Sequence, residues 1–435
     1  MNLQCYNGEK MGNKKRIDNK IVCDLEIIRK ILQEFKNPDE KLNIVHVAGT
    51  NGKGSTVSML AEILIQEKYK VGTFISPSLV SLTERIQIDK SEIGEHELNE
   101  EIKKVIKVLE QNNLFINEFA LLTIVALNIF ASKKCDIVIL EVGLGGRKDP
   151  TNVIQSPILS IITRIGLDHE EILGKTLQEI AYEKMGIIKN KSEVVFYGEN
   201  DYLIQLINEY CNKKQSVCYI PERSKLNIDE ISIEGSKFHY GKYKNIFINL
   251  RGEYQIQNAL VVIESIERIR EKGFYIHNRS ILQGFKKVKW DARLELIHNH
   301  PITILDGSHN PQGVYETCNY MNKVFGEKRI FLILGMLEDK NYATVVELLL
   351  DISSDFIIVP INNGRSIDPN KLRYTVSEKA KKLGKKVFIY VCENLYQCKD
   401  IIKDNVKQED ILLIIGSLHL AGDIKRGLLE YVQNK

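Results

Sequence analysis

Residues 46–56 read HVAGTNGKGST, a glycine-rich segment that joins a strand-like run to a helix-like run. Asn43–Ala48 is largely apolar, as a strand within a sheet requires, and Val57–Gln66 has the apolar spacing of a helix. Such a turn aims several backbone N–H groups and the positive end of a helix dipole at one point. Because a nucleotide phosphate needs this environment, and Lys53 adds a mobile cation, the segment indicates a phosphate-binding loop.

The spacing of this segment departs from the common phosphate-loop pattern GxxxxGK[ST]. Val47 stands where the first glycine of that pattern would be, and Gly54 separates Lys53 from Ser55. The variant GTNGKGS resembles the phosphate loop of the Mur ligase superfamily, whose members are ATP-dependent amide-bond ligases. Taken by itself, the segment has a simpler alternative interpretation, which is a glycine-rich turn without a ligand.

Length and charge set broad limits on the fold and on the partners. The chain has 435 residues, more than a single hydrophobic core usually supports, so we expect two or three domains. Its 60 basic and 57 acidic residues are nearly balanced, and the basic residues are not concentrated in one block. We therefore expect neither a nucleic-acid-binding nor a membrane-binding surface.

The cysteine spacing and the apolar runs indicate the compartment. Of eight cysteines, only the pairs Cys211/Cys218 and Cys392/Cys398 lie close in sequence, and no CxxC occurs. We therefore expect neither a zinc site nor a disulfide framework, and interpret the cysteines as buried or idle thiols of a reducing compartment. The first twenty residues are polar and lack the apolar core of a signal peptide, and no apolar run approaches the roughly 18 residues of a membrane helix. The sequence predicts a soluble cytoplasmic protein.

Strand-like and helix-like runs alternate through the first half of the chain, which predicts an α/β fold with right-handed crossovers and a mostly parallel sheet covered on both faces. The strands expected in this sheet are Ile44–Ala48, Val71–Ile75, Ile137–Val142, Ile158–Thr163 and Glu193–Tyr197. The helices expected between them include Leu98–Leu109, Phe119–Ala131 and Leu177–Ile188. Residues 228–250 alternate short runs with glycine, which predicts antiparallel hairpins appended to the sheet, and a helix over Ile256–Ile269 follows.

Alternation resumes after Trp290 and predicts a second, smaller Rossmann-like α/β domain that begins near His298. Its expected strands are Ile302–Leu305, Ile330–Leu334, Phe356–Pro360, Val387–Val391 and Ile411–Ile415. We therefore expect a first domain with the phosphate loop over residues 1–296 and a second α/β domain over residues 297–435.

Polar residues at two strand ends of the first half are candidate metal ligands. Glu141 ends a buried strand and enters a turn with three glycines, so it is well placed to hold Mg²⁺ beside the phosphate loop. Asp168 and His169 follow the next strand at the same rim. Because imidazole is a softer ligand than Mg²⁺ prefers, His169 would assist a metal whose other ligands are oxygens. The simpler alternatives are a solvated glutamate and an ordinary surface histidine.

Two further segments carry candidate site residues in the second half. WDARLE contains Arg293, and ITILDGSHNP is a buried strand followed by Asp306 and His309. Polar residues at the functional ends of two sheets suggest a ligand cleft between two domains. Arg293 could reach nucleotide phosphates, or it could form a salt bridge at a domain interface. Lys184, in EKMGI, would not be selected by pattern alone, because a lysine on such a helix is normally solvated.

Taken together, these segments resemble the folylpolyglutamate synthase and dihydrofolate synthase family of Mur-type ligases over nearly the whole chain. The matching motifs are NPDEKLNIVHVAGTNGKGST, FISPSLVSLTERIQI, ILEVGLGGRKDPTNVI, LDHEEILGKTLQEIAYEKMGIIK, GEYQIQNAL, WDARLE, LDGSHNP, GMLEDKNY and GSLHLAGD. Any one of them would be weak, but their order along the chain makes the resemblance specific.

The resemblance implies a role for each matching position. It implies that Gly52, Lys53, Gly54 and Ser55 hold the ATP phosphates, that Ser76, Glu141 and His169 are Mg²⁺ ligands, and that Asn258, Arg293 and Asp306 contact the nucleotide. It also implies that His309 acts near the nucleotide, and that Lys184 is carbamylated and binds a second Mg²⁺. The implied substrates are ATP, L-glutamate and a reduced folate or dihydropteroate, and the default assembly is a monomer.

The implied reaction begins with transfer of the ATP γ-phosphoryl group to the substrate carboxylate. This gives an acyl phosphate, which the amine of glutamate then attacks. Mg²⁺ and Lys53 would offset the charge that accumulates as two anions meet. Lys53, Lys184 and His309 are therefore the candidate catalytic residues.

Departures from the family pattern bear on the substrate. Ala120 stands where the family usually has a glutamate, in a helix of the pterin-binding part, and Glu118 lies two positions earlier. Lys148 lies in a loop where dihydrofolate-forming members commonly read RLDATN. Glutamate addition to a folate is therefore the main hypothesis. The alternatives are a related ligase for a different carboxylate and a nucleotide-binding regulator without turnover.

Overall fold

The computed structural model describes residues 24–427, so the polar first twenty residues discussed above lie outside the described residues. Backbone packing divides the chain into two compact units. The first comprises Met1–Ser224 and Gln257–Phe285, and the second comprises Lys225–Ile256 and Lys286–Lys435. Within the described part of the chain, no helix is both long enough and apolar enough to cross a membrane.

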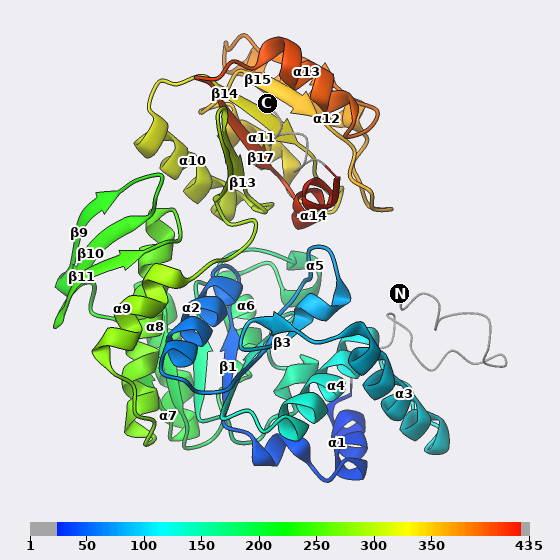
Figure 1. The fold of residues 1–435 in the computed structure, drawn as a ribbon, viewed down its shortest axis with the longest axis vertical. Helices are drawn as coiled ribbons and strands as arrows, with labels where there is room; N and C mark the ends of the chain where they lie inside the picture. Colours follow the sequence, from blue (N-terminus) through cyan, green and yellow to red (C-terminus); the bar gives the residue numbers. More distant parts are fainter. Residues whose placement is uncertain (1–23, 428–435) are drawn as a thin grey trace. The chain divides into compact units, whose positions relative to one another are not determined.

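The first unit is built on an eight-stranded sheet (Figure 1). In spatial order its strands are β4 (Ser91–Glu92), β3 (Ile86–Ile88), β2 (Val71–Phe74), β5 (Ile137–Glu141), β1 (Ile44–Ala48), β6 (Leu159–Ile162), β7 (Glu193–Phe196) and β8 (Val217–Tyr219). Strands β2, β5, β1, β6, β7 and β8 are parallel to one another. Strands β3 and β4 add antiparallel pairs at one edge. The predicted parallel sheet is confirmed. The sequence missed β3, β4 and β8 because such short strands show no clear apolar period.

Helices cover both faces of this sheet (Figure 1). The helices are α1 (Leu25–Glu34), α2 (Lys53–Gln66), α3 (Glu95–Gln111), α4 (Glu118–Ser132), α5 (Glu170–Leu173), α6 (Leu177–Met185), α7 (Asp201–Lys214), α8 (Glu253–Glu271) and α9 (Asn278–Lys287). Short 3₁₀ turns occupy Pro38–Lys41, Leu82–Arg85, Pro150–Val153 and Arg223–Lys225. One core joins α1, α3 and α4 to the sheet. Helix α2 packs on β1, β2 and β5.

Most predicted helices are a few residues shorter than the observed ones, and two ends differ for a clear local reason. Helix α2 begins at Lys53, not at Val57, because Gly52 at its N-cap has a φ of 90° that turns the chain directly into the helix. Lys53, Gly54 and Ser55 are thus its first turn, not part of a preceding loop. Helix α6 begins as predicted at a capping box of Thr176 and Glu179, and it ends at Met185, earlier than expected, because Gly186 caps it.

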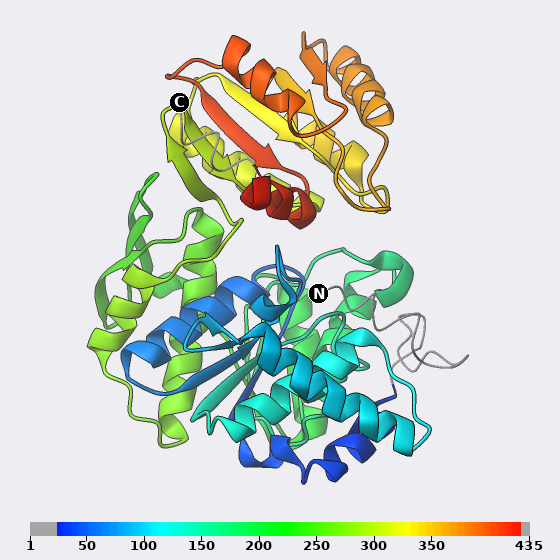
Figure 2. The same ribbon diagram turned by 45° about the vertical axis from the view of Figure 1, so that its right-hand side comes forward.

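The second unit contains a six-stranded sheet with helices packed against it (Figure 2). Its spatial order is β12 (Glu295–Asn299), β13 (Ile302–Leu305), β17 (Ile411–Ile415), β14 (Ile330–Leu334), β15 (Asp355–Ile358) and β16 (Phe388–Val391). The helices are α10 (Pro311–Phe325), α11 (Tyr342–Leu349), α12 (Pro369–Lys382), α13 (Gln397–Asn405) and α14 (Leu418–Gly427). The five predicted strands are present and parallel, and β12 is an antiparallel addition at one edge.

The antiparallel region forms a separate three-stranded sheet, with the order β11 (Tyr243–Ile248), β10 (Ser236–Tyr240) and β9 (Leu226–Ile231). The predicted antiparallel pairing is confirmed, but the predicted attachment to the large sheet is wrong. Ile231 and Ile233 pack against the core of the second unit, and Tyr320 of α10 donates a hydrogen bond to the Ser232 carbonyl over 3.2 Å. The end of β9 and the residues that follow it are therefore anchored to the core of the second unit.

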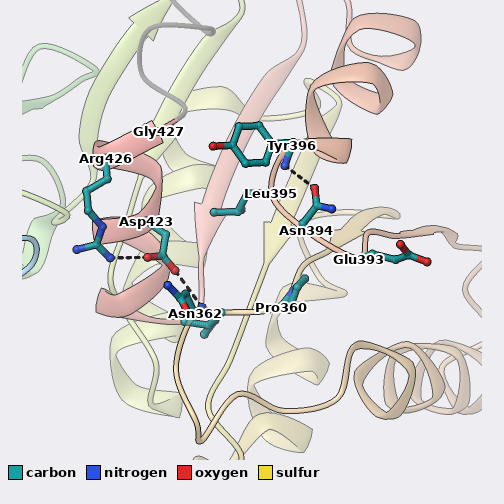
Figure 3. Close-up of a pocket in the computed structure, with 10 residues that line it drawn as sticks. Pro360, Asn362, Glu393, Asn394, Leu395, Tyr396, Asp423, Arg426 and Gly427 are labelled. Atoms are coloured by element: carbon teal, nitrogen blue, oxygen red, sulfur yellow. Dashed lines mark hydrogen bonds and ion pairs between the residues drawn. The ribbon is translucent and has the colours of Figure 1, made fainter.

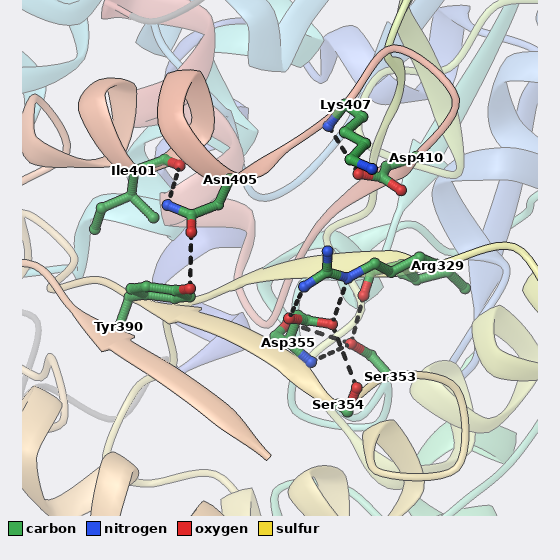
Figure 4. A network of polar contacts seen from close by, with 10 residues as sticks. Arg329, Ser353, Ser354, Asp355, Tyr390, Ile401, Asn405, Lys407 and Asp410 are labelled. Carbon is green, nitrogen blue, oxygen red and sulfur yellow. Dashed lines mark hydrogen bonds and ion pairs between the residues drawn. The ribbon is translucent and has the colours of Figure 1, made fainter. Parts of the chain in front are cut away.

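An ion pair ties two strands of the second unit together at their first residues (Figure 4). Asp355, the buried first residue of β15, accepts hydrogen bonds from Arg329 Nε over 3.0 Å and from Nη2 over 2.7 Å. Arg329 directly precedes β14, the parallel neighbour of β15. This two-point contact supports the register of the pair.

Replacing Arg329 by methionine should lower the free energy of unfolding by about 1–3 kcal/mol, because the Asp355 carboxylate would stay buried without its charged donor. Urea unfolding followed by circular dichroism measures the change. Arg373→Met, which alters an exposed arginine of α12, is the matched control. Equal stability of the two variants would show that the pair does not stabilise the sheet.

Candidate active site

The phosphate loop lies between β1 and α2, where two glycines are required by close packing. Gly49 has a φ of 154°, and a Cβ at this position would lie 1.8 Å from Thr163 Oγ1. Gly52 has a φ of 90°, and a Cβ there would lie 2.5 Å from Asn258 Oδ1. Any larger residue would push the loop away from β6 and α8. Asn258, predicted to contact the nucleotide, thus lies directly beside the loop.

The first turn of α2 presents backbone amides without a side-chain cap, because its N-cap residue is Gly52, which has no side chain. Ser55 is buried in that turn. Uncapped N–H groups and the helix dipole together favour an anion. The structure therefore gives Gly52, Lys53, Gly54 and Ser55 the local geometry of a phosphate site.

Two lysine amines converge on one carbonyl oxygen of this loop. Lys53 Nζ donates to the Gly49 carbonyl over 3.1 Å and to the Thr50 carbonyl over 3.3 Å. Lys184 Nζ donates to the same Gly49 carbonyl over 2.9 Å, although the two residues are far apart in sequence. The loop thus collects positive charge at one point, as expected for a site that receives a polyanion.

Lys184 is buried, and its environment disfavours the charged amine. The pKa of Lys184 is lowered from 10.5 to about 7, chiefly by burial and also by the neighbouring charge of Lys53, while Asp168 and Asp149 act in the opposite direction. Close packing of α6 creates this position, because a Cβ on Gly146 would lie 2.7 Å from the Glu183 carbonyl. The expectation of a solvated lysine from pattern alone is therefore wrong.

The candidate metal ligands Ser76 and Glu141 meet at neighbouring strand ends. Glu141 is the buried last residue of β5, and the Ser76 backbone N–H, just after β2, donates to its Oε2 over 3.3 Å. Their proximity follows from the parallel pairing of β2 and β5. His169 is the N-cap of α5, with a side chain 42% exposed and Nε2 3.9 Å from Asp168 Oδ1.

A metal at this rim would rely on few protein ligands. Among residues 24–427, no three His, Cys, Asp or Glu side chains form a group that could hold a metal ion. Mg²⁺ usually keeps several waters and takes one or two carboxylates together with substrate phosphates. A buried carboxylate beside a phosphate loop fits that preference, so the residues present are compatible with Mg²⁺.

A buried polar network that the sequence analysis missed lies below the loop after Glu141. His46 Nε2 and Thr151 Oγ1 are 2.8 Å apart, and Thr151 Oγ1 and Asp149 Oδ1 are 2.5 Å apart. Asp149 Oδ2 also accepts the Leu144 N–H over 2.9 Å. The network connects β1 to the glycine turn that follows Glu141. A lone histidine inside the apolar strand IVHVA was the signal that could have revealed it.

Burial sets the protonation of this network. The pKa of His46 is lowered from 6.5 to about 3, chiefly by burial and further by the charge of Lys189, so the imidazole is neutral at physiological pH. Burial raises the pKa of Asp149, although hydrogen bonds from Thr151 and Leu144 oppose this effect. The lowered pKa of His46 means that protonation of this histidine by acid opposes folding, whereas the raised pKa of Asp149 acts in the opposite sense.

The remaining candidates lie in the second unit and form a cluster of their own. Ala292 and Leu294 have φ values of 53° and 48°, so Arg293 stands between two residues in the left-handed region. Buried Asp306 holds this turn, because its Oδ2 accepts the Leu294 N–H over 2.8 Å and its Oδ1 accepts the Ser308 N–H over 3.0 Å. Strained residues of this kind cost about 1–3 kcal/mol each and often occur at functional sites.

His309 follows this cluster at the start of α10. Its Nδ1 lies 3.0 Å from the Gly307 carbonyl, which orients the ring. The Gly307 N–H in turn donates to the Ala292 carbonyl over 2.8 Å. One hydrogen-bonded turn thus joins Arg293, Asp306 and His309, although WDARLE and LDGSHNP are separated by β12 and β13.

Ala120, which stands where the family usually has a glutamate, lies in the hydrophobic core. Ala120 is fully buried in α4, and its N–H donates to the capping Asn117 Oδ1 over 2.8 Å. Glu118, at the start of the same helix, lies close enough to Arg85 to raise the pKa of that guanidinium, which burial lowers. Glu118 therefore supplies a negative charge at the start of this helix, close to Arg85.

Comparison with known proteins defines the class of this protein. The family model described as the Mur ligase middle domain matches residues 47–266, and the model described as the Mur ligase glutamate ligase domain matches residues 292–418. Together they define a ligase of the Mur type. The chain is 32% identical over 412 residues to the dihydrofolate synthase/folylpolyglutamate synthase of Bacillus subtilis, covering 92% of this chain and 94% of that protein.

Solved structures agree with this relationship. Folylpolyglutamate synthase from Thermotoga maritima is 28% identical, with a TM-score of 0.81 and coverage of 93% of both chains. Folylpolyglutamate synthase from Mycobacterium tuberculosis, complexed with ADP and AMPPCP, is 25% identical, with a TM-score of 0.83 and coverage of 93% of this chain and 95% of that one. The chain therefore belongs to the folylpolyglutamate synthase/dihydrofolate synthase family. The family resemblance and the α/β fold expected from the sequence are confirmed.

The buried His46 network makes a pH-dependent contribution to stability. Because the folded-state pKa of His46 lies below its unfolded value, the contribution is complete above pH 6.5 and is lost progressively as the pH falls toward 3. The stability advantage of the unsubstituted protein over His46→Asn should therefore shrink between pH 7 and pH 4. Urea unfolding at several pH values measures it, with exposed His96→Asn as control. A difference that is constant with pH would contradict this account.

Proposed function

We propose that this protein is an ATP-dependent ligase that adds L-glutamate to tetrahydrofolate through an acyl-phosphate intermediate, with dihydropteroate as a second acceptor. The observation that carries the proposal is the position of Lys53 at the start of α2, where its amine and the buried Lys184 amine meet at the Gly49 carbonyl, in a chain of this family. The Lys53 ammonium can bind the ATP phosphates and offset the charge that develops as a carboxylate attacks the γ-phosphorus.

The proposed nucleotide site uses the first turn of α2. Gly52, Lys53, Gly54 and Ser55 would hold the phosphates through backbone N–H groups and the Lys53 ammonium. Lys53 now donates to two loop carbonyls and would exchange them for phosphate oxygens when ATP binds. Asn258 would contact the nucleotide beside the loop, where it already packs on Gly52. The named complexes of the Mycobacterium tuberculosis relative support ATP as the nucleotide.

Ser76, Glu141 and His169 would hold Mg²⁺ near these phosphates. The support is the buried Glu141 carboxylate beside Ser76 and the position of His169 after β6, which β1 separates from β5 in the same parallel sheet. When bound, this ion would polarise the γ-phosphoryl group and neutralise part of its charge. The protein would contribute the Glu141 carboxylate, which is held in a buried position largely shielded from water.

Lys184 is proposed to be carbamylated. Only a neutral amine attacks CO₂, and a pKa of about 7 leaves roughly half of the Lys184 amine neutral at pH 7. Carbamylation would replace a cation next to Lys53 by an anion, which relieves like-charge repulsion and creates a ligand for a second Mg²⁺.

Arg293, Asp306 and His309 are proposed to serve the same reaction from the second unit. The Asp306 carboxylate fixes the strained turn that displays Arg293, and this turn would present a guanidinium to the nucleotide. His309, oriented by the Gly307 carbonyl, would act near the nucleotide. We also propose a division of the chain near residues 296 and 297, which the separate family matches support.

A related ligase for a different carboxylate is the second candidate. The observation that favours it is the fully buried Ala120 in place of the family's glutamate, which changes the charge of that helix. A monomer without nucleic-acid partners and a cytoplasmic location stay predictions. The six cysteines among the described residues are free thiols, which is compatible with a reducing compartment.

Purified protein with Mg-ATP and L-glutamate should release phosphate when tetrahydrofolate is added, and the folate product should gain one glutamate by mass. Lys53→Ala should lower this rate at least about 100-fold, because the charge on the transferred group loses its cation. Lys175→Ala, an exposed lysine, is the matched control. If a non-pterin acid is used faster than tetrahydrofolate, the second candidate replaces the first.

Carbamylation of Lys184 can be observed directly by ¹³C NMR with ¹³CO₂. At equal dissolved CO₂, the carbamate signal should be larger at pH 8 than at pH 6, because the fraction of neutral amine rises through a pKa of about 7. Lys184→Met should lack the signal, whereas Lys175→Met should retain it. A signal that survives Lys184→Met would exclude Lys184 as the modified residue.

A further inference from the structure

Two cysteines of the second unit face each other at the base of a short loop. Cys392 directly follows β16, and Cys398 lies in the first turn of α13. Their sulfur atoms are 3.4 Å apart, and neither side chain is exposed. Each sulfur is held by regular structure on its own side, because the Cys392 N–H donates to the Ile358 carbonyl over 2.9 Å and Cys398 belongs to a helix.

The loop between these cysteines lines a cavity of about 560 Å³ (Figure 3). Glu393, Asn394, Leu395 and Tyr396 form one wall, and Asp423 and Arg426 of α14 contribute another part. Asn394 Oδ1 accepts the Tyr396 N–H over 3.0 Å, which keeps the loop compact. A bond between the two sulfurs would tie the base of this wall together.

We propose that Cys392 and Cys398 form a redox-modification site, which a small hydroperoxide converts into an intramolecular disulfide. In the first step the Cys392 sulfur attacks a peroxide oxygen, the O–O bond breaks, and water leaves after proton transfer, giving a sulfenic acid. In the second step the Cys398 sulfur attacks the Cys392 sulfur, the S–O bond breaks, and a second water leaves. Two thiols lose two electrons and hydrogen peroxide gains them.

The geometry assigns the roles of the two sulfurs. The Cys398 thiol donates to the Cys392 sulfur, and this hydrogen bond lowers the pKa of Cys392, although burial opposes it. Cys392 is thus the nucleophile and Cys398 the resolving thiol. Because neither thiol is exposed, a small neutral oxidant reaches them more readily than a bulky disulfide such as oxidised glutathione.

The other adjacent pair provides the internal comparison. Cys211 lies in α7 and Cys218 in β8, and a hydrogen bond also connects their thiols, but Cys218 is partly exposed and the pair lies in the first unit. The variant Cys211→Ser/Cys218→Ser therefore removes the competing pair and leaves the proposed site unchanged.

Peptide mapping tests the proposal on the full-length protein. Cys392 and Cys398 share one tryptic peptide, Val387–Lys399, because no lysine or arginine lies between these ends. After hydrogen peroxide and alkylation, this peptide should weigh two hydrogens less than the reduced form and carry no alkyl group. A thiol reductant should restore two alkylatable sites. The Cys211→Ser/Cys218→Ser variant should behave identically.

Single variants and a second oxidant sharpen the test. Cys398→Ser should leave a sulfenic acid on Cys392 that dimedone traps, and Cys392→Ser should form no cross-link. Oxidised glutathione should cross-link the pair at least about tenfold more slowly than peroxide at equal concentration. A doubly alkylated peptide after peroxide treatment, or a sulfinic acid without a cross-link, would overturn the site. Equal rates with both oxidants would overturn the assignment to a small hydroperoxide.

Discussion

The Gly49 carbonyl oxygen, which accepts hydrogen bonds from the amines of both Lys53 and Lys184, is the contact on which the candidate site depends. Two cations on one oxygen repel each other, and burial of Lys184 adds a desolvation cost. The lowered pKa of Lys184 reduces this repulsion, because part of its amine is neutral near pH 7. The Lys53 amine lies at the same carbonyl, where it is placed to bind an anion.

The parallel sheet of the first unit explains why distant segments supply this site. Parallel strands end on one edge, so the segments after β1, β2, β5 and β6 bring the phosphate loop, Ser76, Glu141 and Asp168 to the same rim. The glycine turn after Glu141 then rests on the His46, Thr151 and Asp149 network. The network holds the turn from below by hydrogen bonds, and burial keeps His46 uncharged at neutral pH.

In the second unit, the candidate site is built on a strained backbone turn, whereas the candidate site of the first unit is built on two lysine amines. The turn at Arg293, with a left-handed residue on either side, is held by the Asp306 carboxylate, which accepts the Leu294 N–H and is itself fixed by the Ser308 N–H. Asp306 has thereby a positioning role that is independent of any ligand contact. In the same unit, Tyr320 of α10 donates a hydrogen bond to Ser232, which follows the last strand residue of β9.

Much of this organisation could be predicted from the sequence, because it depends on local pattern. Apolar runs predicted β1, β13, β14 and β17 with their observed bounds, and the order of motifs along the chain was sufficient to indicate the family. The sequence did not predict the short edge strands, because two or three residues are too few to show an apolar period. Only the tertiary structure revealed the burial of Lys184, its contact with Gly49 and the His46 network. Each of these depends on packing between residues far apart in the chain, and burial changes the protonation of a side chain without leaving a trace in its sequence neighbours.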